Sequence, residues 1–208
     1  MNMMKRAFTL TELLVSLAII GTIAVLAVPP LMSDIHTKVY LNLIKNMSVT
    51  IEQLAADQML NKRSHNLADT DFGSVDSLLS SKHFSIVKKD TNLLTSDYKN
   101  FNNVSVSIDG INGQSLLLKN GVIFTYIPIA NGAISVGTFI MDANGNDGPN
   151  VVGKDLFIFD ITKKGKIIAS PDNDFNSKTS EEKLTDCAGG NGRACYGYVV
   201  ENGWKYPN

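Results

Sequence analysis

The stretch that decides the fold is KRAFTLTEL at residues 5–13, which leads into LLVSLAIIGTIAVLAVPPLMS at residues 13–33. Lys5 and Arg6 end a short polar leader, and no charged side chain occurs from Leu13 to Ser33. At about 1.5 Å of rise per residue, a helix over this run can cross a hydrocarbon core about 30 Å thick. Because basic flanks stay on the cytoplasmic side, we expect the leader to remain inside and the rest to be exported.

Two simpler interpretations are a secretory signal peptide and an ordinary single-pass anchor. A signal peptide has an apolar run of about 7–15 residues and then a small-residue cleavage site. This run is longer, and no clear A-x-A site follows it. An ordinary anchor explains the length and the basic flank, but it does not explain Glu12 at the start of the apolar run. Thr9 and Glu12 have the spacing of a T-x-x-E capping box, so a purely local capping role is an alternative for Glu12.

Residues 5–13 resemble the cleavage and methylation signal of type IV pilin-like proteins. The resemblance rests on the basic leader, the Phe-Thr-Leu sequence, the following Glu and the apolar run, and it ends with that run. It implies that a prepilin peptidase cuts between Ala7 and Phe8, and that the new amine of Phe8 is methylated. It also implies that Glu12 is the acid kept for assembly. The family usually has Gly before the cut, so Ala7 is a departure from the pattern.

The resemblance gives Glu12 a partner. A carboxylate in an apolar layer is costly unless a cation lies beside it. The free amine of Phe8 on a neighbouring subunit is the candidate cation, and such a pair is stronger in a low-dielectric helix bundle than in water. We expect the pair to set the axial register between subunits, while the apolar helix faces supply most of the adhesion.

Beyond Ser33 the pattern is that of an amphipathic helix. Apolar residues recur at three- and four-residue steps on one stripe: Tyr40, Leu43, Ile44, Met47, Ile51, Leu54 and Ala55. We expect one helix from Thr9 to about Leu60, bent or locally melted at Pro29-Pro30 because proline removes a helical hydrogen bond. The stripe is expected to form part of the core of a globular domain.

Strand patterns dominate the rest of the chain, after a loop-rich region at 61–100 with a short helical turn at 75–81. The expected strands are 104–108, 115–119, 122–129, 134–141, 156–161 and 166–169, with a hairpin turn at Asn120-Gly121. One long helix followed by an antiparallel meander is an α+β fold, with the sheet packed on the amphipathic half of the helix. The resemblance implies the same pilin-like architecture. The expected parts are a leader at 1–7, a transmembrane and assembly half of the helix at 8–33, and a pilin-like globular domain at 34–208.

The loop at 142–155 partly resembles a calcium-binding loop, because oxygen donors occur at alternate positions. The candidate ligands are Asp142, Asn144, Asn146, Asp147 and Asp155. The loop does not match an EF-hand, since Asp147 stands where Gly is expected and Gly153 where the bidentate Glu is expected. A turn-rich connection without metal is the alternative, because Asn-Gly and Gly-Pro steps mark turns. No cofactor is expected, and calcium is the one metal to test.

Cys187 and Cys195 are the only cysteines of the chain. Their spacing is too wide for a C-x-x-C redox motif, and no second Cys/His pair supports zinc. Because an exported domain lies in an oxidising space, we expect a disulfide, which for a loop of this size stabilises the fold by about 2–3 kcal/mol. Pilin-like proteins often close a C-terminal loop in this way. The aromatic residues that follow are expected to form an edge strand, to cover the sheet and to leave an exposed patch: Tyr196, Tyr198, Trp204 and Tyr206.

The composition favours no nucleic-acid partner and no enzyme. The net charge is −1 over 208 residues, whereas a nucleic-acid binder usually concentrates basic residues on one face. The sequence has no nucleophile–base arrangement, no phosphate-binding loop and no H-E-x-x-H motif.

The favoured function, which the resemblance implies, is a structural subunit of a type IV pilus or type II secretion filament: a major pilin, a minor pilin or a pseudopilin. The implied partners are other pilin-like subunits, the prepilin peptidase, the inner-membrane assembly platform and the membrane. The implied location is the inner membrane, as a single-pass precursor, and then a periplasmic or extracellular filament. A non-polymerising membrane-tethered binding domain is the main alternative, and a tethered enzyme of unrecognised type is the weaker one.

Overall fold

The computed structural model describes residues 9–80, 83–94, 97–169 and 175–206, without the side chains of residues 27–34 and 176. The expected leader at 1–7 lies outside this part of the chain. The chain divides into two units, Met1–Lys38 and Val39–Asn208. Each unit is described by itself.

Helix α1 spans Leu10–Lys62, within two residues of the expected bounds at both ends. It runs through Pro29-Pro30 without a break, so the local melting expected there does not occur. The two prolines remove only two N–H donors, and Leu and Ala residues with high helix propensity precede them.

Within the described residues, no helix combines the length and the apolar character that a membrane span requires. The expected membrane segment at 8–33 lies partly outside those residues.

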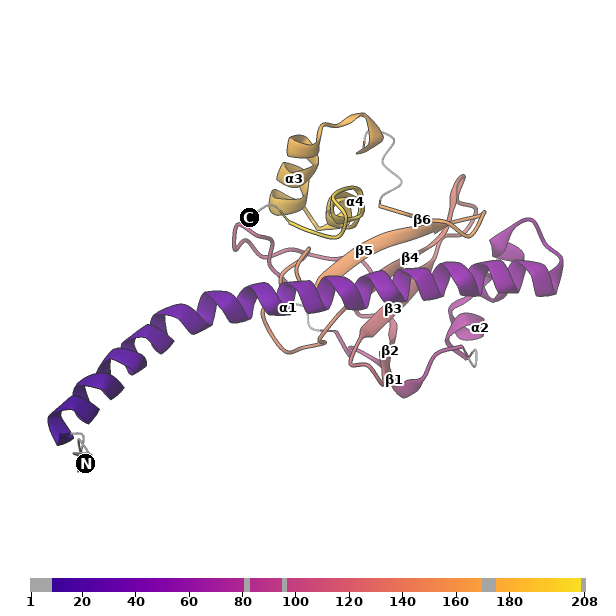
Figure 1. Ribbon diagram of the computed structural model, residues 1–208. Helices are drawn as coiled ribbons and strands as arrows, with labels where there is room; N and C mark the ends of the chain where they lie inside the picture. The colour runs from indigo at the N-terminus through magenta and orange to yellow at the C-terminus, as the bar shows by residue number, and fades with distance from the viewer. Residues whose placement is uncertain (1–8, 81–82, 95–96, 170–174, 207–208) are drawn as a thin grey trace, which may run out of the picture. The chain divides into compact units, whose positions relative to one another are not determined.

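A six-stranded antiparallel sheet follows a short helix α2 at Val75–Ser80 (Figure 1). The strands are β1 Ile86–Thr91, β2 Gln114–Leu118, β3 Ile123–Pro128, β4 Ser135–Asp142, β5 Leu156–Thr162 and β6 Ile167–Ile168. They lie side by side in chain order, so each strand pairs with the next along the sequence. The expected α+β class, a long N-terminal helix followed by an antiparallel meander, is confirmed.

Two strand expectations are wrong. Residues 104–108 form no strand, and their only ladder contact is an isolated bridge between Ser105 and Lys99. The apolar pattern there arises because Val106 and Ile108 pack against the sheet from outside it. The true first strand, β1, lies in the region expected to be loop, and nearly all of it is exposed because it is an edge strand.

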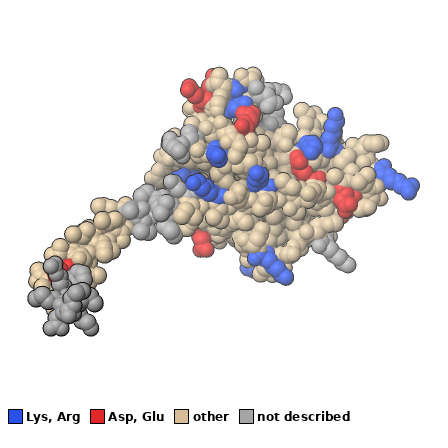
Figure 2. All heavy atoms as spheres, viewed as in Figure 1, with Lys and Arg blue, Asp and Glu red and all other residues tan. Residues whose placement is uncertain are grey.

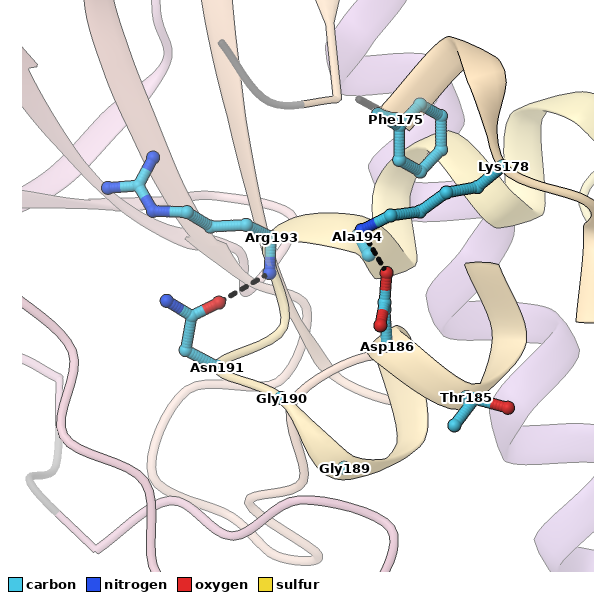
Figure 3. A pocket seen from close by; sticks show the side chains of 9 residues that line it. All are labelled: Phe175, Lys178, Thr185, Asp186, Gly189, Gly190, Asn191, Arg193 and Ala194. Atoms are coloured by element: carbon cyan, nitrogen blue, oxygen red, sulfur yellow. Dashed lines mark hydrogen bonds and ion pairs between the residues drawn. The ribbon is translucent and has the colours of Figure 1, made fainter. Parts of the chain in front are cut away.

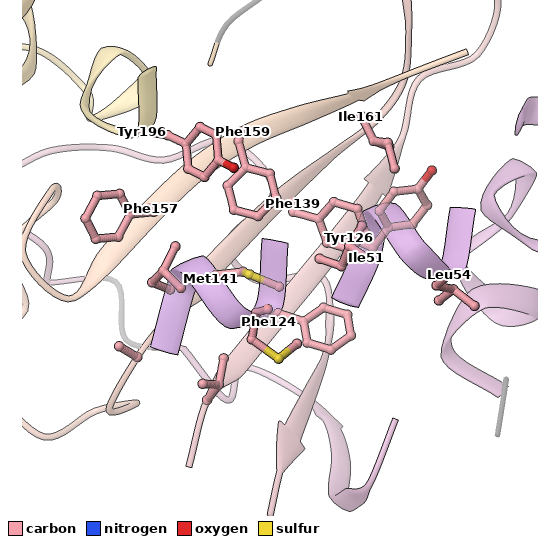
Figure 4. Close-up of a cluster of buried hydrophobic side chains, with 14 of the residues drawn as sticks. Ile51, Leu54, Phe124, Tyr126, Phe139, Met141, Phe157, Phe159, Ile161 and Tyr196 are labelled. Atoms are coloured by element: carbon pink, nitrogen blue, oxygen red, sulfur yellow. The ribbon is translucent and has the colours of Figure 1, made fainter. Parts of the chain in front are cut away.

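The larger core lies on the sheet face that α1 crosses (Figure 4). Ile44, Ile51 and Leu54 of α1 pack against the same cluster as Phe124, Phe139 and Phe159 of the sheet: all six are buried. The three aromatic rings form a row in which each contacts the next, and Phe139 is stacked on Phe159 with 5.7 Å between ring centroids. The amphipathic stripe is therefore part of the core of the domain, as expected.

The opposite face of the sheet is covered by the chain between β1 and β2. Leu94, Tyr98, Ile108 and Ile111 pack there on alternate residues of the strands, such as Ile140 of β4. Strands buried on both faces read as continuous apolar runs, which is why β4 shows no polar alternation.

The C-terminal segment is helical, which corrects the expected edge strand. Helix α3 spans Ser180–Gly189 and helix α4 spans Arg193–Glu201. Thr179 and Glu182 form a reciprocal capping box that starts α3. Tyr196 is buried, and its ring lies 4.5 Å from that of Phe159, so the expected cover of the sheet is present and the expected exposed patch is not.

Candidate functional site

The start of α1 is closed by a capping box between Thr9 and Glu12. The Glu12 carboxylate accepts hydrogen bonds from the Thr9 backbone N–H at 2.9 Å and from its hydroxyl at 2.8 Å. In return, the Glu12 N–H donates to Thr9 Oγ1 at 3.2 Å. The local alternative raised for Glu12 is thus formed in the isolated chain. Ala7 and Phe8, the expected cleavage and methylation residues, lie outside the described part of the chain.

The first turns of α1 are apolar on every side. Ten large apolar residues between Leu10 and Leu26 each expose more than half of their surface: Leu10, Leu13, Leu14, Val15, Leu17, Ile19, Ile20, Ile23, Val25 and Leu26. Two hydroxyl groups in this run bond within the helix: Ser16 donates to the Glu12 carbonyl at 2.7 Å and Thr22 to the Ile19 carbonyl at 2.8 Å. A helix that is apolar all round is stable only when buried in other helices or in lipid.

Residues 2–28 match the family described as the prokaryotic N-terminal methylation motif. The chain carries a prepilin-type signal at its N-terminus. The match covers only this N-terminal segment. No curated protein and no solved structure is significantly similar to the chain.

The loop at 142–155 is organised around two buried carboxylates. Asp142 accepts from the backbone N–H groups of Asn144 at 2.9 Å and Gly145 at 2.7 Å, and from the Tyr98 hydroxyl. Asp155 accepts from the N–H groups of Asn150 and Val151, both at 2.7 Å. Burial raises the pKa of both carboxyl groups, that of Asp142 to about 7. The two acids therefore act first as anchors for turns.

The expected calcium ligands differ in their exposure to solvent. Asp142 and Asp155 are buried and already accept from N–H groups, Asn144 is half-buried, and Asn146 and Asp147 are exposed. The side-chain oxygen of Asn144 is buried without a hydrogen-bond partner, and calcium accepts such amide oxygens. Among the described residues, no three His, Cys, Asp or Glu side chains converge as a metal site. Calcium at this loop stays a prediction.

Cys187 and Cys195 form the expected disulfide, which joins α3 to α4. Both residues are fully buried. A second link between the helices is the ion pair of Lys183 and Glu201 at 2.8 Å, in which the Lys183 side chain is only 8% exposed. The two C-terminal helices therefore form one cross-linked hairpin.

A pocket of about 400 Å³ lies where this hairpin turns (Figure 3). Lys178 reaches across it to Asp186, and their charged atoms are 2.7 Å apart. The guanidinium of Arg193 points away from this pair, toward Asp160 at 3.7 Å. The two charges inside the pocket neutralise each other. The sequence pattern did not indicate this pocket, because its walls come from both sides of a glycine-rich turn that was expected to lie beside a strand.

Charged residues of both signs are interspersed over the face shown in Figure 2. Among the described residues, Lys88 pairs with Asp90 at 2.9 Å, and Lys166 pairs with the half-buried Glu52 at 3.2 Å. Exposed ion pairs contribute little to stability, because solvent and salt screen them. The Glu52 carboxylate has a second contact, because it also accepts from the Ile167 N–H of β6 at 3.0 Å and so covers part of that sheet edge.

Proposed function

We propose that this pilin-like protein is a structural subunit of a type IV pilus or type II secretion filament. The main support for this proposal is the helix at residues 10–26, which is apolar on every side and belongs to a segment that matches a prepilin-type signal. An exported chain with such a helix needs lipid before assembly and other helices after it. Neighbouring copies, or other pilin-like subunits, provide those helices.

The sheet edges support association through helices. The β1 edge carries Lys88, Lys89 and Asp90, and its pairing with β2 is irregular between Ile86 and Lys88. The β6 strand is only two residues long, and the N–H of Ile167 already donates a hydrogen bond to the Glu52 carboxylate. Short, charged and irregular edges disfavour the addition of further strands.

Processing and location follow the same proposal. A prepilin peptidase cuts between Ala7 and Phe8, the amine of Phe8 is methylated, and an inner-membrane assembly platform takes up the mature subunit. The precursor is held in the inner membrane, and the product is a periplasmic or extracellular filament. Glu12 then pairs with the Phe8 amine of a neighbouring subunit.

The test is to follow the full chain in cells that carry an active prepilin peptidase and a filament assembly system. We expect the chain in sheared filaments, and cross-links between introduced cysteines at Val15 and Ile19 of different copies or partner pilins. As a control, a cysteine at the exposed Asp109 should form no cross-link of this kind. A processed chain that stays monomeric in the membrane, without intersubunit cross-links, would support the tethered binding domain instead.

A further inference from the structure

The cross-linked α3–α4 hairpin holds the loop that ends in Asp155. Gly153 lies against the disulfide with a positive φ of 90°, and a methyl group there would stand 2.6 Å from Cys195 Sγ. The carbonyl of Gly153 accepts a hydrogen bond from the Tyr206 hydroxyl, just beyond α4. Val152 packs on the other side of the hairpin turn, so closely that a methyl group at Gly192 would stand 2.3 Å from Val152 Cγ1.

The same hairpin holds a second loop, at residues 98–104. The Asn100 side chain donates to the Gly189 carbonyl at the end of α3, at 3.0 Å. Its amide oxygen accepts from the N–H groups of Asn102 and Val104, both at 3.0 Å, so this one side chain both shapes the loop and ties it to the hairpin. The ring of Phe101 contacts Tyr206, with 5.4 Å between centroids.

These two loops carry the partners of the buried carboxylates. Tyr98, which donates to Asp142, lies two residues before Asn100. Asp155, which binds the turn at Asn150 and Val151, lies two residues after Gly153. The loops also join each other, since the Val152 N–H donates to the Lys99 carbonyl at 2.8 Å and the Lys99 N–H donates to the Asn150 carbonyl at 3.0 Å.

We propose that the Cys187–Cys195 disulfide is a redox-dependent latch that orders the two loops at residues 98–104 and 149–156. With the bond closed, Cys195 Sγ and Tyr206 keep Gly153 in place, and Gly189 is positioned to accept from Asn100. With the bond open, the Lys183–Glu201 ion pair is the remaining side-chain link described above between α3 and α4, and the contacts that hold both loops loosen. This inference does not depend on filament assembly.

The redox step is a simple exchange. Opening the latch adds two electrons and two protons to the disulfide and gives two thiols. A dithiol reductant supplies them and becomes a cyclic disulfide. Closing the latch after export returns two electrons and two protons to a disulfide-bearing oxidant of the exported compartment. On this proposal, the chain leaves the reducing cytoplasm with mobile loops, and the loops become ordered outside.

Hydrogen exchange measured by mass spectrometry tests the latch on the full chain in detergent. We expect residues 98–104 and 149–156 to exchange about tenfold faster in the reduced protein and in Cys187→Ser/Cys195→Ser, with little change in β3 and β4. A change confined to residues 180–206 would overturn the proposal, and so would equal acceleration over the whole sheet, which would indicate general unfolding.

Two tyrosine variants separate the latch from the folding contribution of the disulfide. Tyr206→Phe removes only the hydroxyl that binds the Gly153 carbonyl and leaves the disulfide and the ring in place. We expect faster exchange at 149–156 and unchanged exchange at α3. Tyr198→Phe makes the same chemical change on the ring stacked against Tyr206, 5.9 Å away, and should leave both loops unchanged. Equal effects of the two variants would contradict the assignment.

Discussion

Glu12 and Thr9 bond to each other in both directions, with the Glu12 carboxylate 2.9 Å from the Thr9 backbone nitrogen and 2.8 Å from its hydroxyl. A lone subunit therefore has a local partner for its acid before it meets a neighbour. The proposed cut between Ala7 and Phe8 would leave both residues of the box in the mature chain. The proposed assembly through Glu12 would then have to compete with this internal contact.

The first prediction concerns processing. We expect the mature chain to begin at a methylated Phe8, because residues 5–13 resemble a prepilin cleavage signal and residues 2–28 match the N-terminal methylation motif. Mass spectrometry of the chain extracted from membranes measures this directly. Ala7→Gly restores the usual residue before the cut and should be processed at least as fast, whereas an intact Met1 start in cells with an active peptidase would contradict the prediction.

The second prediction concerns the disulfide in the exported protein. Both cysteines are buried, so unreactive thiols in the native state would not distinguish a bond from burial. Alkylation should therefore be carried out in denaturant, with and without prior reduction. We expect no labelling before reduction and two labels after it, and a loss of about 2–3 kcal/mol of stability on reduction. Two labels without reductant would show that the bond is absent.

The sequence predicted secondary structure well where a residue pattern repeats along the chain. It predicted poorly where the structure depends on contacts between residues far apart in the sequence. The periodic stripe of α1 and the apolar runs of β2 to β5 predicted the architecture. β1 was missed because Val87, Lys88 and Lys89 are all exposed, which leaves no alternation to detect. The C-terminal helices were missed because alternating aromatics look like a strand, although the Thr179–Glu182 capping box was visible as a helix start.

The same distinction between local patterns and distant contacts applies to the candidate sites. The prepilin-type signal is a local motif, so its residues could be named from the sequence. The pairing of Tyr98 with Asp142 joins residues 44 positions apart, and only the folded sheet brings them together. The role of Asp142 as a turn anchor could not be read from a loop rich in Asn, Asp and Gly, in which every oxygen is equally a candidate ligand.

The third prediction concerns calcium at residues 142–155. If the loop binds calcium, millimolar calcium should raise the melting temperature of the full chain in detergent and a chelator should lower it, because a ligand stabilises the state that binds it. Magnesium at the same concentration is the control. Asp147→Ala removes an exposed candidate ligand without touching the buried anchors, and it should reduce the shift. No shift with calcium leaves the loop as a turn connection.

The fourth prediction follows from the buried Asp142. Burial raises the pKa of this carboxyl to about 7, against an ordinary value of 3.8, although three hydrogen bonds favour the charged form. The folded state therefore binds more protons than the unfolded state between these values. The free energy of unfolding should fall as the pH rises from about 4 to about 7, and the penalty is fully present above pH 7.

Asp142→Asn tests this dependence, because it removes the buried charge and keeps an oxygen for the Asn144 and Gly145 N–H groups. We expect the variant to lose that part of the pH dependence and to gain on the order of 1–2 kcal/mol relative to wild type at pH 8. Thermal unfolding at several pH values, in calcium-free buffer, measures both effects. Asp109→Asn makes the same change at an exposed position. Equal slopes for wild type and Asp142→Asn would show that Asp142 does not titrate in this range.

The last prediction separates the two roles of Glu12. Glu12→Gln keeps an oxygen that can accept from the Thr9 N–H, so it preserves most of the capping box but removes the charge. Glu12→Ala removes both. A purely local cap would make Gln nearly harmless, whereas an ion pair with the Phe8 amine of a neighbour would make Gln almost as damaging as Ala, since the amine would lose its counter-charge in an apolar layer.

We expect the yield of sheared filaments to fall sharply for both Glu12 variants, while membrane insertion and cleavage of the precursor continue. Thr9→Val is the matched control, because it removes the hydroxyl that the box uses but leaves the Glu12 charge and the Thr9-position N–H in place. It should weaken the cap and release Glu12 for its neighbour, so filament yield should be close to that of wild type. Normal filaments from Glu12→Gln would defeat the ion pair and leave Glu12 as a helix cap. A loss of filaments in Thr9→Val that matches the loss in Glu12→Ala would lead to the same conclusion, because the shared defect would then be the cap.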